Sequence, residues 1–481
     1  MKRLQKNIRR IAFFLCALFL LLIAYGAYSI STYGSRWFAS SANTFARSRK
    51  KDVIAGDILD RNGTVLASTV HLSSGTDGKR VYQADLAARK ATVHAVGDSS
   101  YNVNNSAESF YATYLYGFDM SFLERLSFAL RGEQRRGDTV QLTIDSRLAA
   151  YVASVFPSGK CGAVVVMNYQ TGEVLTEQSF PNFDPQNITA AVRADAQKPF
   201  FNRAVQGLYT PGSTFKIVTA ACAMENMPDY AGQLFQCAGT LQAGQRIITD
   251  AGTDLAEGQL VQHGEIGLKR AFQVSCNNTF ARLALQLGDA KLRKTAEAFG
   301  FNDNFLFRDL VVENSSYPTE NRNDGEVAWT GAGQSALSTS PMHMCMIAAA
   351  VANDGVMMEP RMLLAATASN GIIRSAFSPR VYRRPLTEEQ AAVLKDYMRA
   401  VVTGGTGTSA QIPGKKVCGK TGSAEIDSQE NTNAWFVGFL DEPSSPYALS
   451  IVVEDAGGGG SVAAPLARKI FAWMLDNGYE K

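Results

Sequence analysis

Cysteine and histidine are scarce in this sequence. Its 481 residues include seven cysteines and four histidines (His71, His94, His263 and His343). The histidines show no metal-ligand spacing, either with one another or with the cysteines. Cys222 and Cys237 are close enough in sequence to form a disulfide, but spacing alone does not establish one. We therefore exclude a disulfide-stapled scaffold and expect mostly buried free thiols, no metal site and no cofactor.

A strong charge of one sign is also absent. The formal net charge is +3, and the basic residues are scattered except at the N-terminus. This balance excludes nucleic acid as a partner. With 46% hydrophobic and 19% charged residues the composition is that of a globular protein. The length favours two folded domains, one large and one small.

Long hydrophobic runs are missing everywhere except near the N-terminus. Five cations lie within residues 1–10, and the stretch from Ile11 to Ser35 carries no charge. About 20 apolar residues, at ~1.5 Å per residue, cross the hydrocarbon core of a bilayer. We predict a cytoplasmic basic tail (1–10), a transmembrane helix (11–32) and an extracytoplasmic remainder, because positive charge favours the inner side. The alternative is a cleaved signal peptide, whose apolar core has only ~7–15 residues.

One stretch indicates nucleophilic chemistry. Residues 209–216 read Tyr-Thr-Pro-Gly-Ser-Thr-Phe-Lys and lead into an apolar run typical of a buried helix. Ser213 is then expected at a helix N-terminus, with the Lys216 amine close enough to take its hydroxyl proton. A Ser-Xaa-Xaa-Lys match arises by chance about once in a chain of this length. Ser48 to Lys51 is another match, so this motif alone does not decide the chemistry.

Two further motifs follow in chain order. These are Ser275-Cys-Asn277 and Lys420-Thr-Gly422, the order required of a penicillin-recognising serine enzyme. Ser-Xaa-Asn also occurs at Ser41 and Ser100, whereas Lys-Thr-Gly occurs once. With these motifs the chain resembles, over nearly its whole length, a class B penicillin-binding protein. That family consists of membrane-anchored peptidoglycan D,D-transpeptidases, which are penicillin-recognising serine acyltransferases.

The resemblance implies an α+β fold in two parts. After the transmembrane helix we expect a small irregular pedestal domain (33–157) and a penicillin-binding transpeptidase domain (158–481). Strand-like runs at 161–168, 173–180, 433–439 and 447–454, and one beginning at Lys420, predict a central antiparallel sheet beside a helical subdomain. Helices flank that sheet.

Local signals add detail to this fold. Asn62-Gly63 predicts a β-hairpin within 55–67 that ties the pedestal to the catalytic domain. Ser146 is expected to cap a short helix that ends at Val155. Apolar patterning predicts a buried helix at 341–351 and a C-terminal helix at 463–474 that lies on the sheet.

The resemblance also implies roles for individual residues. The catalytic set is Ser213, Lys216, Ser275, Asn277 and Lys420, and the substrate-binding set is Thr421, Gly422 and Ser423. Ser213 would attack the carbonyl between the two D-alanines of a peptide ending in D-Ala-D-Ala, with Lys216 as base. Ser275 would relay a proton, and Asn277 would bond both Lys216 and the substrate amide.

The substrate-binding residues complete the expected site. Lys420 and Thr421 would hold the terminal carboxylate, and Gly422 would let the strand backbone approach the ligand. The backbone N–H groups of Ser213 and Ser423 would form the oxyanion hole. A second cation near Lys216, together with burial, is expected to lower the pKa of that lysine.

Function and partners follow from the same resemblance. The implied enzyme cross-links stem peptides of peptidoglycan outside the membrane and is acylated by β-lactams. A D,D-carboxypeptidase is the main alternative, because it differs only in whether water or an amine resolves the acyl-enzyme. A membrane-bound β-lactamase is less favoured, since no Glu-Xaa-Xaa-Leu-Asn stretch occurs between Asn277 and Lys420. A non-catalytic β-lactam receptor would need a cytoplasmic effector, for which residues 1–10 leave no room.

Polymerisation of the glycan must come from another protein. Residues 36–136 are poor in helical periodicity and too few for a helical glycosyltransferase domain. Class B enzymes act beside a multispanning polymerase of the SEDS family. We expect such a partner to bind through Ile11 to Ile30 and the hairpin region from Asp57 to Ala67. A plain tether is the alternative for the span, because it lacks a stripe of small residues.

Overall fold

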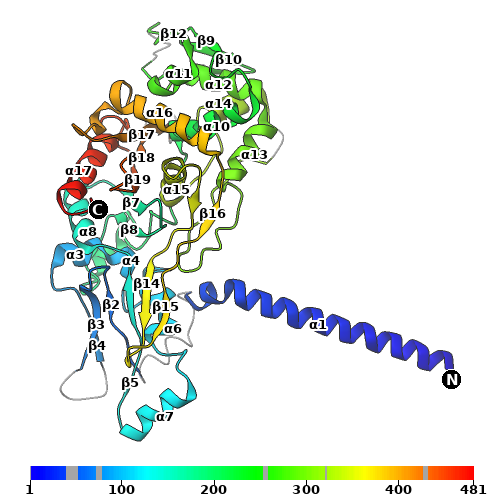
Figure 1. Ribbon diagram of the computed structural model, residues 1–481, viewed down its shortest axis with the longest axis vertical. Coiled ribbons are helices and arrows are strands. Elements are labelled where there is room, and N and C mark those ends of the chain that lie inside the picture. Colours follow the sequence, from blue (N-terminus) through cyan, green and yellow to red (C-terminus); the bar gives the residue numbers. More distant parts are fainter. Residues whose placement is uncertain are drawn as a thin grey trace.

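A computed structural model describes residues 2–39, 53–71, 78–252, 258–319, 322–425 and 432–480. Helix α1 (Lys2–Ala39) projects from an elongated body as a single rod (Figure 1). Its 28 residues from Arg3 to Ile30 are long and apolar enough to cross a membrane, and no other helix in the described ranges is. Most of the predicted span at 11–32 lies within this stretch. Residues 40–52, between α1 and the body, are outside the described residues.

The lower part of the body in Figure 1 contains a six-stranded sheet with the order β15-β14-β6-β2-β3-β4. Its strands in chain order are β2 (Ile58–Leu59), β3 (Val65–His71), β4 (Gly78–Tyr82), β6 (Thr139–Leu142), β14 (Leu363–Thr367) and β15 (Ile373–Ala376). Strands β2 and β3 pair antiparallel around Asn62-Gly63, which confirms the predicted hairpin. Strand β14 pairs with β6, so a segment from far downstream completes this sheet.

Short helices lie between β4 and β6 in the chain, where the sequence predicted irregular structure. They are α3 (Leu86–Ala91), α4 (Val93–Val96), α5 (Ala107–Phe110), α6 (Ala112–Leu115) and α7 (Phe122–Arg131). All but α7 are too short to show a helical period in the sequence. A parallel pair of two-residue strands, β1 (Val53–Ile54) and β5 (Arg135–Arg136), joins the start of this region to its end.

The other sheet has five strands in the order β17-β18-β19-β7-β8, all antiparallel. They are β7 (Gly162–Asn168), β8 (Val174–Phe180), β17 (Val417–Glu425), β18 (Thr432–Leu440) and β19 (Tyr447–Val453). The predicted antiparallel sheet, made from early and late segments of the chain, is therefore confirmed. Lys420 lies inside β17 rather than at its start.

Helices cover both faces of this five-stranded sheet. Val165 and Met167 of β7 belong to the same core as helix α15 (Pro341–Ala352), in which every residue is buried. Val164 and Val166 point to the opposite side and pack with α8 (Ser146–Val155) and α17 (Ala463–Asp476). Burial on both faces explains why these strands are continuously apolar. The buried helix and the C-terminal helix on the sheet are confirmed.

Helices also form a subdomain at the top of the body in Figure 1, at the opposite end from the six-stranded sheet. It contains α10 (Lys216–Asn226), α11 (Leu268–Val274), α12 (Asn277–Leu287), α13 (Asp289–Phe299), α14 (Asp324–Gly331) and α16 (Glu388–Gly404). Two small hairpin-like pairs accompany them, β9 (Leu234–Cys237) with β12 (Gly264–Gly267) and β10 (Thr240–Ala243) with β11 (Arg246–Thr249). A further pair joins β13 (Met357–Met358) to β16 (Val381–Arg383).

The β2–β3 hairpin is tied to the five-stranded sheet through α8. Asp145 caps α8 by accepting the backbone N–H groups of Arg147 and Leu148, so the predicted cap at Ser146 is wrong by one residue. Ser146 instead donates its hydroxyl to Asp60 of the hairpin at 2.7 Å. Asn62 donates to Asp145 at 3.0 Å. The hairpin therefore helps to set the position of a helix that packs on the central sheet.

Candidate active site

Ser213 lies in a one-turn 3-10 helix (Gly212–Phe215) that continues into α10. The turn begins with Gly212 at φ +56, where a side chain would approach the carbonyl oxygen of Ser423 to 3.0 Å. Phe215 is fully buried against Phe301 and fixes the turn in the core. Ser213 is half-buried, one residue before the wall formed by Thr214 and Phe215. The expected helix N-terminus is thus a tighter 3-10 turn.

A second turn carries Ser275 and Asn277 between α11 and α12. Ser275 has φ +62, a left-handed conformation that is uncommon for serine and concentrates at functional sites. Its backbone N–H donates to the carbonyl of Phe272 at 3.2 Å. Cys276 then caps α12, since its sulfur accepts the backbone N–H of Thr279 at 3.3 Å. These contacts fix the backbone of Ser275 and the start of α12, where Asn277 is the first residue.

Lys216 joins the two turns. Its Nζ donates to the Ser275 carbonyl at 2.6 Å and to Asn277 Oδ1 at 2.7 Å, and it lies 3.2 Å from Ser275 Oγ. Among the residues that the structure describes, Lys216 has no hydrogen bond to Ser213. The Asn277 side-chain nitrogen donates to the Thr249 carbonyl at 2.8 Å, so one of its two hydrogens is already used.

Lys420 reaches the same hydroxyl from the sheet. Its Nζ donates to Ser275 Oγ at 2.9 Å and to the Thr421 carbonyl at 2.8 Å. Both lysines are completely buried. Burial lowers the pKa of Lys216 to about 8, and burial together with the charge of Lys216 lowers the pKa of Lys420 well below its usual value.

A cavity of about 510 Å³ opens onto these groups. Six of the eight predicted site residues line it, and the other two, Lys216 and Lys420, lie behind the lining and contact Ser275. The lining includes Ser213, Ser275, Asn277, Thr421, Gly422 and Ser423. The structure thus brings together residues from three distant segments of the chain.

The cavity also contains polar residues that the motifs did not include. Thr406 shares a hydrogen bond of 2.5 Å with the Thr421 hydroxyl. Gln334 donates to the Ser423 carbonyl at 3.3 Å. Both lie beside glycine in loops, and the segments Gly333-Gln334 and 405–408 are further matches to the family resemblance. Asp250 also lines the cavity, and no local pattern marked it.

Gly422 has a different contact from the one expected. A Cβ atom at this position would meet Thr214 Cγ2 at 3.0 Å and the Pro211 carbonyl at 3.1 Å. The missing side chain therefore allows β17 to pack against the Ser213 turn, rather than only leaving room for a ligand. This contact sets the spacing between Ser213 and the sheet edge.

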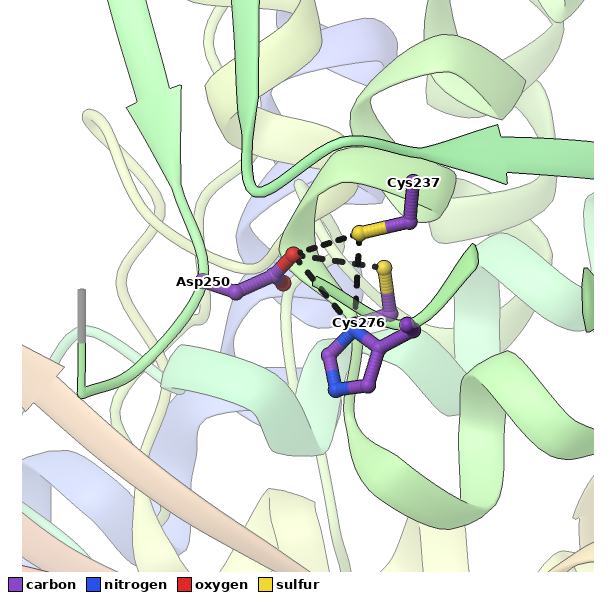
Figure 2. A group of neighbouring side chains, drawn as sticks. Cys237, Asp250 and Cys276 are labelled. Atoms are coloured by element: carbon purple, nitrogen blue, oxygen red, sulfur yellow. Dashed lines mark hydrogen bonds and ion pairs between the residues drawn. The ribbon is translucent and has the colours of Figure 1, made fainter. Parts of the chain in front are cut away.

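Beside the Ser275 turn lies a cluster of metal-ligand side chains that the sequence analysis missed. Cys237, Asp250, His263 and Cys276 offer ligand atoms that all lie within 4.8 Å of one another. Figure 2 shows the two sulfur atoms and an imidazole nitrogen converging on the Asp250 carboxylate. The spacing of these residues in the sequence gave no sign that they lie together. All seven cysteines are free, so the suggested pair of Cys222 and Cys237 does not form a disulfide.

Comparison with known proteins agrees with this arrangement. Residues 162–472 match the family described as "Penicillin binding protein transpeptidase domain". The chain is 29% identical to the peptidoglycan D,D-transpeptidase PbpA of Mycolicibacterium smegmatis, over 99% of this chain and 100% of that protein. It is 27% identical to the peptidoglycan D,D-transpeptidase MrdA of Acinetobacter baumannii, over 72% of this chain and 55% of that protein.

Solved structures give the same picture. A D,D-transpeptidase domain of a peptidoglycan glycosyltransferase from Eggerthella lenta is 30% identical, with a TM-score of 0.76, over 89% of this chain and 99% of that one. Penicillin-binding protein A of M. tuberculosis, as an imipenem acyl-enzyme complex, is 25% identical with a TM-score of 0.78. That comparison covers 88% of this chain and 99% of the other.

Proposed function

The chain belongs to the penicillin-binding protein transpeptidase family, and from this membership we propose that it is a peptidoglycan D,D-transpeptidase that is acylated by β-lactams. Ser213 is the nucleophile, Lys216 the base, and Lys420 the cation that faces the substrate carboxylate. The observation that carries the proposal is the Ser275 hydroxyl, which lies within hydrogen-bonding distance of both buried amines.

The hydrogen bonds of Lys216 suit a neutral amine. Its two shortest contacts, to the Ser275 carbonyl and Asn277 Oδ1, both require the lysine to donate. A neutral amine has two hydrogens for them and keeps one lone pair. That lone pair can accept a proton from a hydroxyl, as a general base must. A pKa of about 8 leaves a useful neutral fraction near neutral pH.

Ser275 connects the two lysines in this scheme. Its oxygen accepts an N–H from Lys420 at 2.9 Å and lies 3.2 Å from the donating Lys216 amine, so a proton carried by Lys216 can reach this hydroxyl. After Ser213 attacks the carbonyl, the proton held by Lys216 can pass through this hydroxyl to the departing amine of D-alanine. An amine of a neighbouring stem peptide then attacks the acyl-enzyme and releases Ser213.

The substrate carboxylate is placed by β17. Thr421 and Ser423 lie on the cavity wall next to Lys420, and the Thr406 hydroxyl orients that of Thr421. The backbone N–H groups of Ser213 and Ser423 form the oxyanion hole in this proposal, and each such donor contributes about 3 kcal/mol to the transition state. The cavity would take a peptide ending in D-Ala-D-Ala.

Penicillin labelling tests the nucleophile. Ser213→Ala should abolish labelling of the full-length protein by a fluorescent penicillin, and it should leave the thermal unfolding transition unchanged because the side chain is small. Ser48→Ala is the matched control, since Ser48 begins the other Ser-Xaa-Xaa-Lys match. Labelling of the Ser213→Ala variant at the wild-type level would contradict the assignment.

Product analysis separates the transpeptidase from its alternatives. With a D-Ala-D-Ala peptide and an amine acceptor, a transpeptidase forms the cross-linked product, whereas a carboxypeptidase releases D-alanine by hydrolysis alone. Rapid turnover of a chromogenic cephalosporin, in place of a stable acyl-enzyme, would favour a β-lactamase.

We further propose that α1 anchors the protein with its N-terminus in the cytoplasm and its catalytic part outside. The domain limits 33–157 and 158–481 belong to this proposal. Protease added to intact cells or spheroplasts should digest the region beyond Ser35. Full protection on an accessible outer face would refute this orientation.

A SEDS-family polymerase is the proposed membrane partner. Replacing Ile11 to Ile30 by an unrelated span tests whether the helix binds the partner or is only a tether. Loss of co-purification with the polymerase, and failure to rescue a deletion strain, would favour binding. Disruption of the Asp57 to Ala67 hairpin region should weaken the complex, and unchanged binding in both variants would end the partner proposal.

A further inference from the structure

Helix α7 turns its apolar side away from the body of the protein. None of its residues is buried. At 3.6 residues per turn, four large apolar side chains lie within an arc of about 100° and are 41 to 78% exposed: Phe122, Leu123, Leu126 and Leu130. The half-buried residues, Glu124 and Phe128, are on the opposite side of the helix. A helix on the surface of a globular protein normally packs its apolar side against the core, so α7 has the reverse arrangement.

The polar side of α7 fixes its position. Ser121 and Glu124 form a capping box at the start of the helix, and Glu124 also forms an ion pair with Arg374 of β15. The same arginine contacts Asp119, which precedes the helix, at 3.8 Å and Asp138, which follows it, at 3.3 Å. Because one buried-side cation holds the segments before, within and after α7, the exposed apolar arc is a fixed feature of the fold.

The β14–β15 hairpin adds exposed apolar side chains beside α7. Ile372 and Ile373, at the turn of this hairpin, are 55 and 64% exposed. The next residue in the chain is Arg374, which binds Glu124 of α7. Two segments far apart in the sequence thus expose apolar side chains at the lower end of the body in Figure 1. Exposed apolar surface rimmed by polar residues marks a contact with a protein or a membrane.

The neighbours of α7 in the chain place it close to the membrane anchor. Helix α1 contacts α5 and α6, which directly precede α7. Strand β5 directly follows α7 and pairs with β1, which begins at Val53. The 13 residues between α1 and Val53 span at most about 45 Å. Helix α7 therefore lies between two segments that are both tied to the anchor helix.

The charge around the apolar arc favours a lipid surface. Residues 118–136 contain three carboxylates, two of which bind Arg374, and four arginines: Arg125, Arg131, Arg135 and Arg136. Arg125 and Arg131 are exposed and lie on either side of the arc. Arg131 and Arg136 form ion pairs at the surface, which are weak and leave a guanidinium able to bind a headgroup phosphate. The surface is therefore basic as well as apolar.

We infer that α7 and the turn of the β14–β15 hairpin lie in the outer surface of the membrane that α1 crosses. Their apolar side chains would enter the boundary between headgroups and acyl chains. An exposed apolar arc flanked by cations is the pattern of an interfacial helix, and arginines near the surface attract anionic headgroups. The inference rests on the proposed anchoring by α1 and not on the transpeptidase activity.

This contact has a consequence for the Ser213 cavity. Residues of α11 and α12 line that cavity, and these helices belong to the subdomain at the opposite end of the body from α7 (Figure 1). With α7 at the bilayer, the body has a second attachment besides α1. The two attachments together hold the end that borders the cavity away from the lipid.

Fluorescence in lipid vesicles tests the contact. The full-length protein carries Cys16→Ser and Cys161→Ser, and its other five cysteines are buried, so an environment-sensitive dye reacts only with an introduced cysteine. Leu130→Cys is labelled and reconstituted into vesicles of phosphatidylethanolamine and phosphatidylglycerol. We expect a blue shift of the emission and quenching by spin-labelled lipids, because Leu130 lies in the apolar arc.

Two control sites carry the same dye. Leu234→Cys replaces a leucine of β9 that is 59% exposed in the helical subdomain, far from α7 in Figure 1. Ser127→Cys is on α7 itself, about 90° from the middle of the arc. We expect no lipid quenching at Leu234→Cys and shallower quenching at Ser127→Cys than at Leu130→Cys. Equal spectra and equal quenching at Leu130→Cys and Leu234→Cys would overturn the inference.

Variants of the helix separate the apolar contribution from the charge. Leu123→Asp combined with Leu126→Asp should abolish the blue shift at Leu130→Cys and leave the thermal unfolding transition unchanged, because neither leucine is buried. Arg125→Gln and Arg131→Gln should each lower the partition of α7 into anionic vesicles about fivefold, with no effect in vesicles of phosphatidylcholine. Penicillin labelling should be unchanged in all four substitutions. A blue shift that persists in the double aspartate variant would contradict membrane contact.

Two further outcomes would overturn the inference at identifiable points. Extraction of the reconstituted protein by alkaline carbonate would refute its premise, the anchoring by α1. A blue shift at Leu130→Cys that requires a co-expressed membrane protein would assign the apolar arc to that protein and not to lipid. Loss of penicillin labelling in the Ser213→Ala variant bears on neither, so failure of this inference and failure of the proposed function are distinguishable.

Discussion

The two sheets of this protein each end on an edge strand that carries a lysine, and the two edges differ in burial. Lys420 on β17 is completely buried, whereas Lys79 on β4 is exposed. Strand β17 is covered by α16 and by the turn that carries Ser213. Strand β4 has a solvent-facing half, and exposed charge is a common protection of such edges against pairing with other chains. A covered edge can perturb a lysine for chemistry, and an open edge cannot.

The largest expected difference concerns stability. Ile451 lies in the middle strand of the five-stranded sheet and is completely buried, so Ile451→Ala should lower the free energy of unfolding by about 2–5 kcal/mol. Val70→Ala, on an exposed face of β3, should change it by less than about 0.5 kcal/mol. Denaturant unfolding of the two variants measures both values. Equal losses would show that the two sheets are packed alike.

The two edge lysines give the next contrast. Lys420→Ala should reduce the rate of acylation by penicillin about 100-fold, because it removes a cation that contacts Ser275 and that we propose faces the substrate carboxylate. Lys79→Ala should leave this rate unchanged. The time course of labelling by a fluorescent penicillin, with the reaction quenched at set intervals, measures both rates. Similar rates in the two variants would remove the functional distinction between the edges.

The pH dependence of acylation sharpens the same contrast. Since burial lowers the pKa of Lys216 to about 8, its neutral form is gained as the pH rises. Acylation should therefore increase about tenfold per pH unit below pH 8 and level off above it. Between pH 8 and the ordinary lysine range the unfolded chain binds more protons, so this group makes the free energy of unfolding rise with pH. A rate that is flat from pH 6 to 9 would contradict a lysine base.

The smallest expected effect lies at the junction of the two regions. Asn62→Ala removes the hydrogen bond to Asp145 and should cost about 1 kcal/mol in the free energy of unfolding. Penicillin acylation should stay at the wild-type rate, because the contact is remote from the cavity lining. A large loss of acylation would show that the hairpin controls the site directly.

Sequence patterns predicted the five-stranded sheet because its strands are long, apolar and separated by turns. Val164 to Met167 alternate between two cores, yet all are apolar, which identifies a strand buried on both faces. The three motifs also predicted which segments meet, because the side chains of one motif must contact those of the other two for the proposed chemistry. The tighter 3-10 turn at Ser213 and the packing role of Gly422 depend on close contacts between segments, which no local pattern reports.

The metal-ligand cluster was missed for a similar reason. Its four residues come from four separate segments, and neighbouring ligands are too far apart in the chain to resemble a known motif. The fold of the β9–β12 and β10–β11 pairs brings them together. Sequence spacing detects a metal site only when two ligands share one turn or helix.

The insertion of β14 and β15 into the six-stranded sheet has a consequence for biogenesis. Strand β6 is complete once residue 142 has been made, but its neighbour β14 begins only at residue 363. The six-stranded sheet therefore cannot close until most of the chain has been synthesised. A single cut between the two regions, near residue 157, should leave both fragments bound to each other. The two regions are interlocked, because β14 from the downstream part of the chain pairs with β6 in the six-stranded sheet.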